Sequence, residues 1–297
     1  MTPRRLVNDA IASRVMLALT VLSILLVFFM AFGLYLKSRP ILCAKSLTEL
    51  IFSGSWFPMK GKFGFFPFIM GTLWVTGVAL VIAVPFCLLT AIYLSEYSSR
   101  RVRDWSKPFI DVLSGIPSVV YGVWGVLVIV PLIKNVLSPL CGISSTGYSV
   151  LAGAIVLAIM VFPVIIHVSV EVLRSVPYEV REASLALGAT KWQTVKHVVV
   201  RKAMPGIMAA IVLGLSRAFG ETMAVLMVAG NVAKAPRSLF DPAYPLPALI
   251  ANNYGEMLSI PLYDSALMLA SLILLIVVIF FNAVSRAILM RVERSIQ

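Results

Sequence analysis

The chain has 297 residues, of which 60% are hydrophobic and only 13% are charged, and its mean hydropathy is +0.97. Soluble domains average about 45–50% apolar and about 25% charged residues, so this composition excludes an ordinary soluble protein and is typical of a polytopic membrane protein in contact with lipid. The formal net charge of +12 would suggest nucleic-acid binding in a soluble domain. Here the basic residues lie at the ends of apolar runs, as at membrane surfaces, so we expect no nucleic-acid partner.

Six apolar runs reach the length of about 20 residues that a membrane-spanning helix needs. They cover residues 15–36, 69–94, 109–133, 149–173, 207–229 and 264–289. The first run is longer than the apolar part of a signal peptide and no small-residue cleavage site follows it, so we expect it to be retained. The predicted fold class is an all-α membrane protein, with a tail at 1–14 and one transmembrane domain over 15–297.

The distribution of basic residues predicts the orientation of the spans. Lys and Arg are twice as frequent in the segments on the side of both termini as in those on the other side. The positive-inside rule therefore predicts that both termini, and the long segment 174–206, are cytoplasmic. The loops 37–68 and 231–263 are then external, with a short helix expected at 245–254.

The three cysteines are not expected to have a catalytic or metal-binding role. Cys87 lies inside an apolar run and is predicted to be a packing residue. Cys43 and Cys141 fall on the same predicted side of the membrane, where their spacing permits a disulfide but does not require one. Free thiols are the favoured interpretation.

The cytoplasmic segment 174–206 begins with RSVPYEVREASLALGATKWQTVKHVVV. Pro177 suits the start of a helix and Gly188 suits its end. We therefore expect a short helix, a turn and a second amphipathic helix on the cytoplasmic surface. An interfacial connector between two spans would show the same pattern, so it is the alternative interpretation.

This segment resembles the EAA loop of permeases of ATP-binding cassette (ABC) importers, in which Glu-Ala-Ala is followed by three residues and Gly. Glu182, Ala183 and Gly188 match that pattern and Ser184 replaces the second Ala, although the family's proline in the second half of the loop is missing. The resemblance implies that residues 182–189 form the helix that docks on an ATP-binding subunit, with these four residues coupling ATP hydrolysis to transport. It also implies the six-helix, MetI-like bundle of type I importers.

The fifth span, GLSRAFGETMAVLMVAGN, contains Arg217 and Glu221 in an apolar run. A charge at the bilayer centre costs about 2.5–3.5 kcal/mol on insertion scales, so such residues face other helices or a water-filled cavity. Because they are four residues apart, we expect them to share a helix face and to pair. The Arg217 guanidinium suits bidentate binding of a tetrahedral oxyanion, and Ser216 and Thr222 are further candidates on the substrate pathway. A purely structural ion pair is the alternative.

The same run resembles phosphate permeases of the Pst type, and its GETMAV sequence is more similar to their C subunit than to their A subunit. The segments DVLSGIPSVVYG (111–122) and AIYLSEY (91–97) are also similar to the C subunit of these permeases. The resemblance implies import of inorganic phosphate across a prokaryotic cytoplasmic membrane. The implied partners are a second permease of the A type, two ATP-binding subunits and an external phosphate-binding protein. ATP and Mg²⁺ would bind to the ATPase subunits, so neither a cofactor nor a metal is expected in this chain.

Three alternatives stay open at this stage. Sulfate or molybdate could replace phosphate as the transported anion. A self-sufficient secondary transporter is disfavoured because no inverted repeat is visible. An intramembrane enzyme is disfavoured because the sequence lacks the metalloprotease histidine motif and the nucleophile elbow, and it has no P-loop with which to hydrolyse ATP. Weaker candidates for the pathway are Asp111, Ser118 and Tyr121, near the third span.

Overall fold

Six helical segments are long and apolar enough to cross a membrane in the computed structural model, which describes residues 3–256 and 259–296. They are Ile11–Ala44, Phe66–Tyr97, Ser118–Leu140, Val150–Ser175, Lys191–Gly220 and Tyr263–Ile288. The predicted number of spans is therefore confirmed, but the third and fifth differ from the predicted ranges.

The first half of the chain contains α1 (Pro3–Ala44), α2 (Leu47–Phe52), β1 (Trp56–Phe57), η1 (Pro58–Lys60), β2 (Lys62–Phe63), α3 (Phe66–Ile92), η2 (Tyr93–Tyr97), α4 (Arg100–Gly115), α5 (Ser118–Trp124), η3 (Gly125–Ile129), α6 (Val130–Leu132), η4 (Ile133–Leu137) and α7 (Ser138–Leu140). The second half contains α8 (Val150–Ser175), α9 (Tyr178–Ala186), α10 (Lys191–Thr194), η5 (Val195–Val199), α11 (Val200–Gly220), α12 (Met223–Val228), α13 (Leu246–Asn253) and α14 (Tyr263–Ile296). Segments η2 to η5 are π-helical turns, whereas η1 is a 3-10 turn.

The core of the bundle is built around α8, the most deeply buried of the six spans. It packs against α3 and α11, and glycines allow the close approach. A Cβ atom added at Gly214 of α11 would lie 2.7 Å from the Ile165 side chain of α8, and one at Gly153 of α8 would lie 3.2 Å from Val75 of α3. Small residues at such contacts let helix backbones approach closely in a membrane, where packing replaces the hydrophobic effect as the force between helices.

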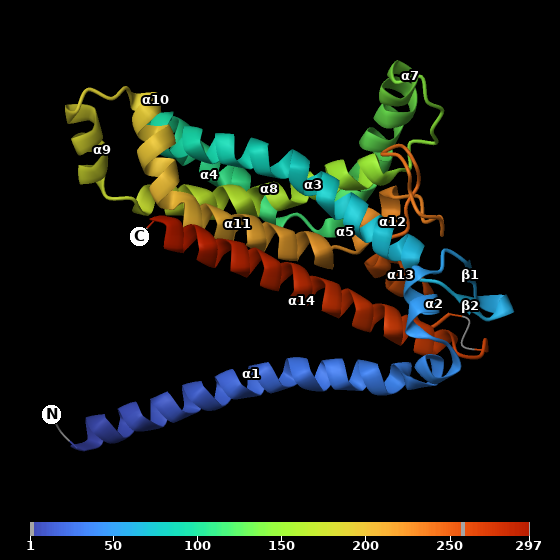
Figure 1. Ribbon diagram of the computed structural model, residues 1–297. Helices are drawn as coiled ribbons and strands as arrows, with labels where there is room; N and C mark the ends of the chain where they lie inside the picture. The colour runs from blue at the N-terminus through green and yellow to red at the C-terminus, as the bar shows by residue number, and fades with distance from the viewer. Residues whose placement is uncertain (1–2, 257–258, 297) are drawn as a thin grey trace.

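Helix α1 diverges from the bundle along most of its length (Figure 1). Every residue from Ile11 to Met30 is exposed, whereas Ile41, near the end of the helix, is fully buried. The first span is thus present where predicted, but the helix is longer at both ends and includes most of the predicted tail at 1–14. The exposed apolar length of α1 is a surface for lipid or for another membrane helix.

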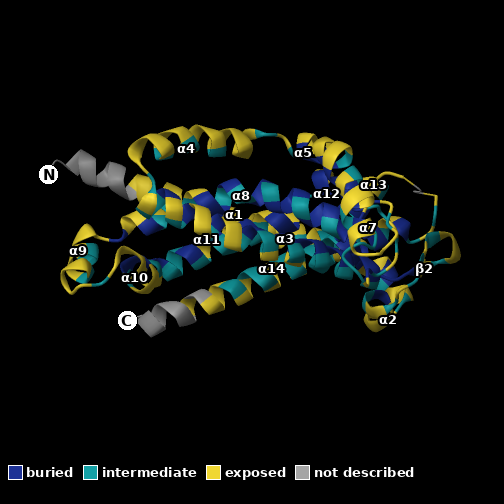
Figure 2. Cartoon of the chain, turned by 90° about the horizontal axis from the view of Figure 1, so that it is seen from above, coloured by how far each residue is buried: buried dark blue, intermediate teal, exposed yellow. Residues whose placement is uncertain are grey.

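The third span begins later than predicted. Helix α4 ends at Gly115, Ile116 and Pro117 adopt extended conformations, and a new helix runs from Ser118 to Leu140. Proline disfavours the helical conformation of the residue before it, which explains the interruption. The predicted range 109–133 therefore joins the end of α4 to the first part of the helical segment Ser118–Leu140. Figure 2 shows α4 beside the bundle; of its residues, all of them described, none is buried.

The fifth span is also different from the prediction, at both ends. A single helix runs from Lys191 through η5 and α11 to Gly220, so residues 191–206 are the first part of the membrane helix rather than a separate surface helix. It ends at Gly220, and the last residues of the predicted range belong to the short helix α12. Apolar composition continues across this break, which is why hydropathy alone did not locate it.

An aromatic cluster holds together one end of the bundle, which we call the hairpin end. Strands β1 and β2 form an antiparallel pair with Trp56 opposite Phe63. The Trp56 ring lies 5.0 Å from that of Phe68 on α3 and 6.3 Å from that of Tyr263 on α14, centroid to centroid. Such ring pairs add to the apolar area that they bury. Helix α13 confirms the short helix predicted at 245–254.

The two chain ends share the other end of the bundle, which we call the α9 end. Figure 1 shows the first turns of α1 and the last turns of α14 there, together with α9 and α10. The three cysteines, all within the described residues, are free thiols. Cys87 is buried as predicted, and Cys43 and Cys141 are exposed.

Candidate functional site

The predicted Arg217–Glu221 pair lies at the break between α11 and α12. Glu221 is the residue at which α11 stops, with an extended backbone (φ −73°, ψ 123°). Its Oε1 atom accepts a hydrogen bond of 3.2 Å from the backbone N–H of Ala224, so the carboxylate caps α12. The expectation of one helix face was wrong because the helix ends at Gly220, and no ion pair joins these two described residues.

Arg217 is exposed and has no ion-pair partner among residues 3–256 and 259–296. It lies one turn beyond Gly214, which contacts Val161 and Ile165 near the middle of α8. Arg217 is therefore close to the centre of the bundle's length. A permanently charged side chain exposed at that depth requires water, an anion or another chain beside it.

A second helix break, between α4 and α5, lies near Arg217. The guanidinium is close enough to act electrostatically on Tyr121 of α5, whose hydroxyl donates a 2.7 Å hydrogen bond to the Leu113 carbonyl of α4. That bond bridges the break between α4 and α5. Helices α5 and α12 are packed so closely that a Cβ atom added at Gly122 would lie 3.2 Å from the Cα of Ala224. The structure thus brings two helix breaks and one unpaired arginine together.

The other sequence candidates have local partners. The Ser216 hydroxyl lies 3.0 Å from the Val212 carbonyl and 2.5 Å from Oδ1 of Asn282, a polar residue of α14 that the sequence analysis missed. The Thr222 hydroxyl donates to the Gly220 carbonyl at 3.3 Å. Both hydroxyls are engaged within the chain, so their role on a pathway stays a prediction.

Two of the weaker candidates, Asp111 and Ser118, lie on either side of the break between α4 and α5. Asp111 and Ser114 of α4 line a cavity of about 300 Å³ with His167 of α8. Ser118 is the first residue of α5 and follows the break at Pro117. Neither residue forms an ion pair with Arg217 in the described structure.

Helix α9 forms the exposed part of the predicted coupling segment. It starts after Pro177 and is followed by Gly188 in the left-handed conformation (φ 84°), as predicted for both residues. The predicted coupling range 182–189 therefore covers the second half of this helix and the turn after it. Glu182 and Ala183 are exposed, whereas the Ser184 hydroxyl faces inward and lies 2.9 Å from that of Thr194 in α10.

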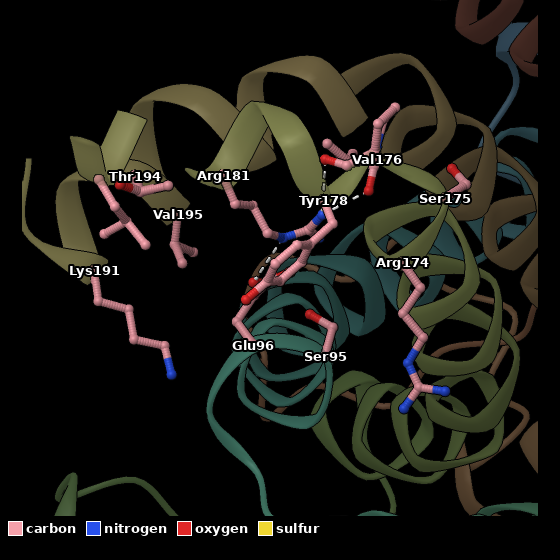
Figure 3. A pocket seen from close by; sticks show the side chains of 12 residues that line it. Ser95, Glu96, Arg174, Ser175, Val176, Tyr178, Arg181, Lys191, Thr194 and Val195 are labelled. Atoms are coloured by element: carbon pink, nitrogen blue, oxygen red, sulfur yellow. Dashed lines mark hydrogen bonds and ion pairs between the residues drawn. The ribbon is translucent and has the colours of Figure 1, made fainter. Parts of the chain in front are cut away.

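An ion pair that the sequence analysis missed attaches α9 to the bundle (Figure 3). Arg181 binds Glu96 of η2 through two bonds, Nη2–Oε1 of 2.7 Å and Nε–Oε2 of 3.2 Å. Beside this pair is a cavity of about 680 Å³ between α9, α10, η2 and the end of α8. The sequence does show an acidic residue, Glu96, at the end of a span and an arginine, Arg181, next to the EAA-like motif. Because the two residues are 85 positions apart, no local pattern predicts that they pair.

The family description "Binding-protein-dependent transport system inner membrane component" matches residues 83–297. The chain belongs to this family. The Phosphate transport system permease protein PstC of Mesorhizobium japonicum is 34% identical over 300 residues, covering 96% of this chain and 91% of that protein. The Probable ABC transporter permease protein YqgH of Bacillus subtilis is 41% identical over 238 residues, or 80% of this chain and 75% of that one.

A solved structure confirms the fold. A chain of a bacterial alginate ABC transporter, crystallised with a periplasmic protein bound to an alginate pentasaccharide, aligns over 96% of this chain and 97% of its own length. The TM-score is 0.60 at 17% sequence identity, so this likeness concerns the fold alone. The predicted importer-permease bundle is therefore confirmed, and the family makes this chain an integral membrane protein.

Proposed function

We propose that this chain is the permease subunit through which an ABC importer moves inorganic phosphate across the cytoplasmic membrane. The observation that carries the proposal is Arg217, an exposed arginine without an ion-pair partner in the described chain, placed near two helix breaks, one before the third span and one after the fifth. The similarity to a phosphate permease over nearly the whole chain supports phosphate as the anion.

Arg217 suits transient binding of an oxyanion. Its planar fork donates two parallel hydrogen bonds to neighbouring oxygens of a tetrahedral anion. Glu221 makes no ion pair with the Arg217 guanidinium. Its carboxylate instead accepts a hydrogen bond from the backbone N–H of Ala224 and so caps the start of α12. Its negative charge near the same break opposes anion binding, which favours release, and conduction needs sites that a solute can also leave.

The partners follow from the exposed surfaces. Helix α9, which has no buried residue among its described positions, is proposed to dock on one of two ATP-binding subunits, which bind ATP and Mg²⁺. The exposed apolar length of α1 is proposed to contact a second permease and lipid. The hairpin end is proposed to receive an external phosphate-binding protein, and the α9 end with both chain ends is cytoplasmic. This chain itself is proposed to be non-catalytic.

The substrate is tested with the complete transporter. The complex is isolated through an affinity tag on this chain, reconstituted in liposomes that contain ATP, and supplied with its binding protein and labelled phosphate. Phosphate uptake is expected to continue undiminished in excess sulfate or molybdate. Competition by either anion would replace phosphate with that substrate class, and ATP-independent uptake by the purified chain alone would contradict an ABC permease.

The orientation is tested by the natural cysteines. Cys43 and Cys141 are exposed, whereas Cys87 is buried. In cells with a permeabilised outer barrier and an intact cytoplasmic membrane, a membrane-impermeant maleimide is expected to label Cys43 and Cys141 and to spare Cys87. The single variants Cys43→Ala and Cys141→Ala identify each labelled site. Labelling of both only after the cytoplasmic membrane is opened would reverse the proposed orientation.

A further inference from the structure

Arg181 connects three segments of the chain at the α9 end. Besides its two bonds to Glu96, its Nη2 donates to the Leu173 carbonyl at 2.9 Å, and Nη1 donates to the Val176 carbonyl at 2.5 Å. Leu173 belongs to the last turns of α8, and Glu96 follows α3. One guanidinium therefore binds the ends of α3 and α8 from a side chain on α9 (Figure 3).

The Glu96–Arg181 pair is largely shielded from solvent, in contrast to the other ion pairs of the described chain. The side chains of Arg181 and Glu96 are 14% and 8% exposed, whereas one partner of each other pair is more than half exposed. Exposed pairs contribute little because water and salt screen them. A charge that is largely shielded from water is unfavourable without its partner, so this pair resists opening.

The Glu96–Arg181 pair is the main polar attachment of helix α9. None of the nine described residues of α9 is buried, so apolar packing contributes little to its position. Its other polar contact to the bundle is between Ser184 and Thr194. Next to the pair, the Lys191 ammonium lies 4.5 Å from the centroid of the Tyr97 ring, which holds α10 to the same π-helical turn, η2. These contacts attach the segments on both sides of the 187–190 turn to η2, at the end of α3.

We propose that Glu96 and Arg181 are positioning residues that make α9 and the ends of α3 and α8 move as one rigid body. This inference rests on the proposed function, because it takes α9 as the helix that an ATP-binding subunit pushes. Helices α3 and α8 share the main core cluster, and α8 contacts α11 at Gly206 and Gly214. A displacement of α9 is therefore passed through α8 to the helix that carries Arg217.

The proposal is tested by measuring both rigidity and coupling in the assembled transporter. With the natural cysteines replaced by Ala, spin labels are placed at Glu179, in the first turn of α9 and outside the docking range 182–189, and at Leu89, on α3, both of which are exposed. We expect one narrow distance that is the same without nucleotide and with trapped ATP. In Glu96→Gln the distance distribution is expected to broaden and to change with nucleotide.

The coupling measurement is the amount of phosphate imported per ATP hydrolysed. We expect this ratio to fall about fivefold in Glu96→Gln, with ATP hydrolysis retained, because loss of a contact between coupled elements weakens their coupling. Arg181→Lys keeps the charge but loses the fork, and is expected to lower the ratio less. Asp104→Asn, which removes an exposed ion pair from α4, is the matched control and should behave as the unaltered protein.

Two results would overturn the proposal. One is a narrow, nucleotide-independent label distance in both Glu96→Gln and Arg181→Lys, and the other is an unchanged ratio of phosphate to ATP in both. If Glu96→Gln does not assemble, as judged by size-exclusion chromatography, Arg181→Lys decides. If the unaltered transporter does not import phosphate, the proposed substrate fails, while the label distances still test the positioning role because they require no substrate.

Discussion

Replacement of Arg217 by Gln is expected to lower phosphate uptake by about 10- to 100-fold, since a hydrogen bond to a charged group is worth about 1.5–3 kcal/mol. The variant removes the guanidinium from the neighbourhood of the two helix breaks, but it leaves the helix contacts of Gly214 intact. Because Arg217 has no ion-pair partner among the described residues, its loss should not unfold the bundle. The measurement is the initial rate of labelled-phosphate uptake by reconstituted transporter, with the amount of assembled complex determined in parallel.

The controls separate a pathway role from a structural one. Arg201→Gln removes an exposed arginine from the same helix nearer the α9 end, and its uptake should be close to normal. Arg217→Lys keeps the charge without the planar fork and should be intermediate. Normal uptake by a fully assembled Arg217→Gln transporter would contradict a place on the pathway. Equal losses of thermal stability in Arg217→Gln and Glu221→Gln would favour the structural interpretation.

Replacement of Gly188 by Val is expected to uncouple ATP hydrolysis from uptake. Gly188 has φ 84°, a conformation that is strained for a β-branched residue by about 1–3 kcal/mol. Among the described atoms, none lies within 4 Å of a Cβ added there, so the effect comes from the backbone rather than from a clash. The turn after α9 must then rearrange, which displaces Glu182 and Ala183 from the proposed docking surface. The measurement is phosphate imported per ATP hydrolysed.

Asparagine provides the matched control at the same position. It adopts the left-handed conformation more readily than other non-glycine residues, so Gly188→Asn is expected to retain most of the coupling. If the Val and Asn variants couple equally well, the turn does not need its left-handed residue. If both fail equally, the side chain at position 188 meets the ATP-binding subunit directly.

Local sequence was sufficient for the features that depend on a single segment. Each span transfers its own apolar surface into lipid, so hydropathy identified all six before any packing was known. The start and end of α9 were likewise predictable, because Pro177 and Gly188 act through their own backbone preferences. The EAA-like motif indicated the family for the same reason, since it is a continuous stretch of chain.

The two helix breaks, between α4 and α5 and between α11 and α12, were harder to predict. Pro117 gave a readable signal for the break after α4, but the apolar run on both sides concealed it. The break at Glu221 has only Gly220 before it, and glycine is common inside membrane helices. The four-residue spacing of Arg217 and Glu221 was therefore interpreted as one helix face, and the structure instead assigns Glu221 to the cap of α12.

The sequence by itself determined that this protein is a six-span membrane bundle with a short helix between Pro177 and Gly188 and an arginine in the apolar run of the fifth span. The tertiary structure alone decided that this arginine stands without an ion-pair partner in the described chain, and that Arg181 meets Glu96. The physical reason is the same in both cases. Hydropathy and helix capping act within one segment, whereas a charge pair requires two helix ends to meet, and that depends on how every helix between them packs.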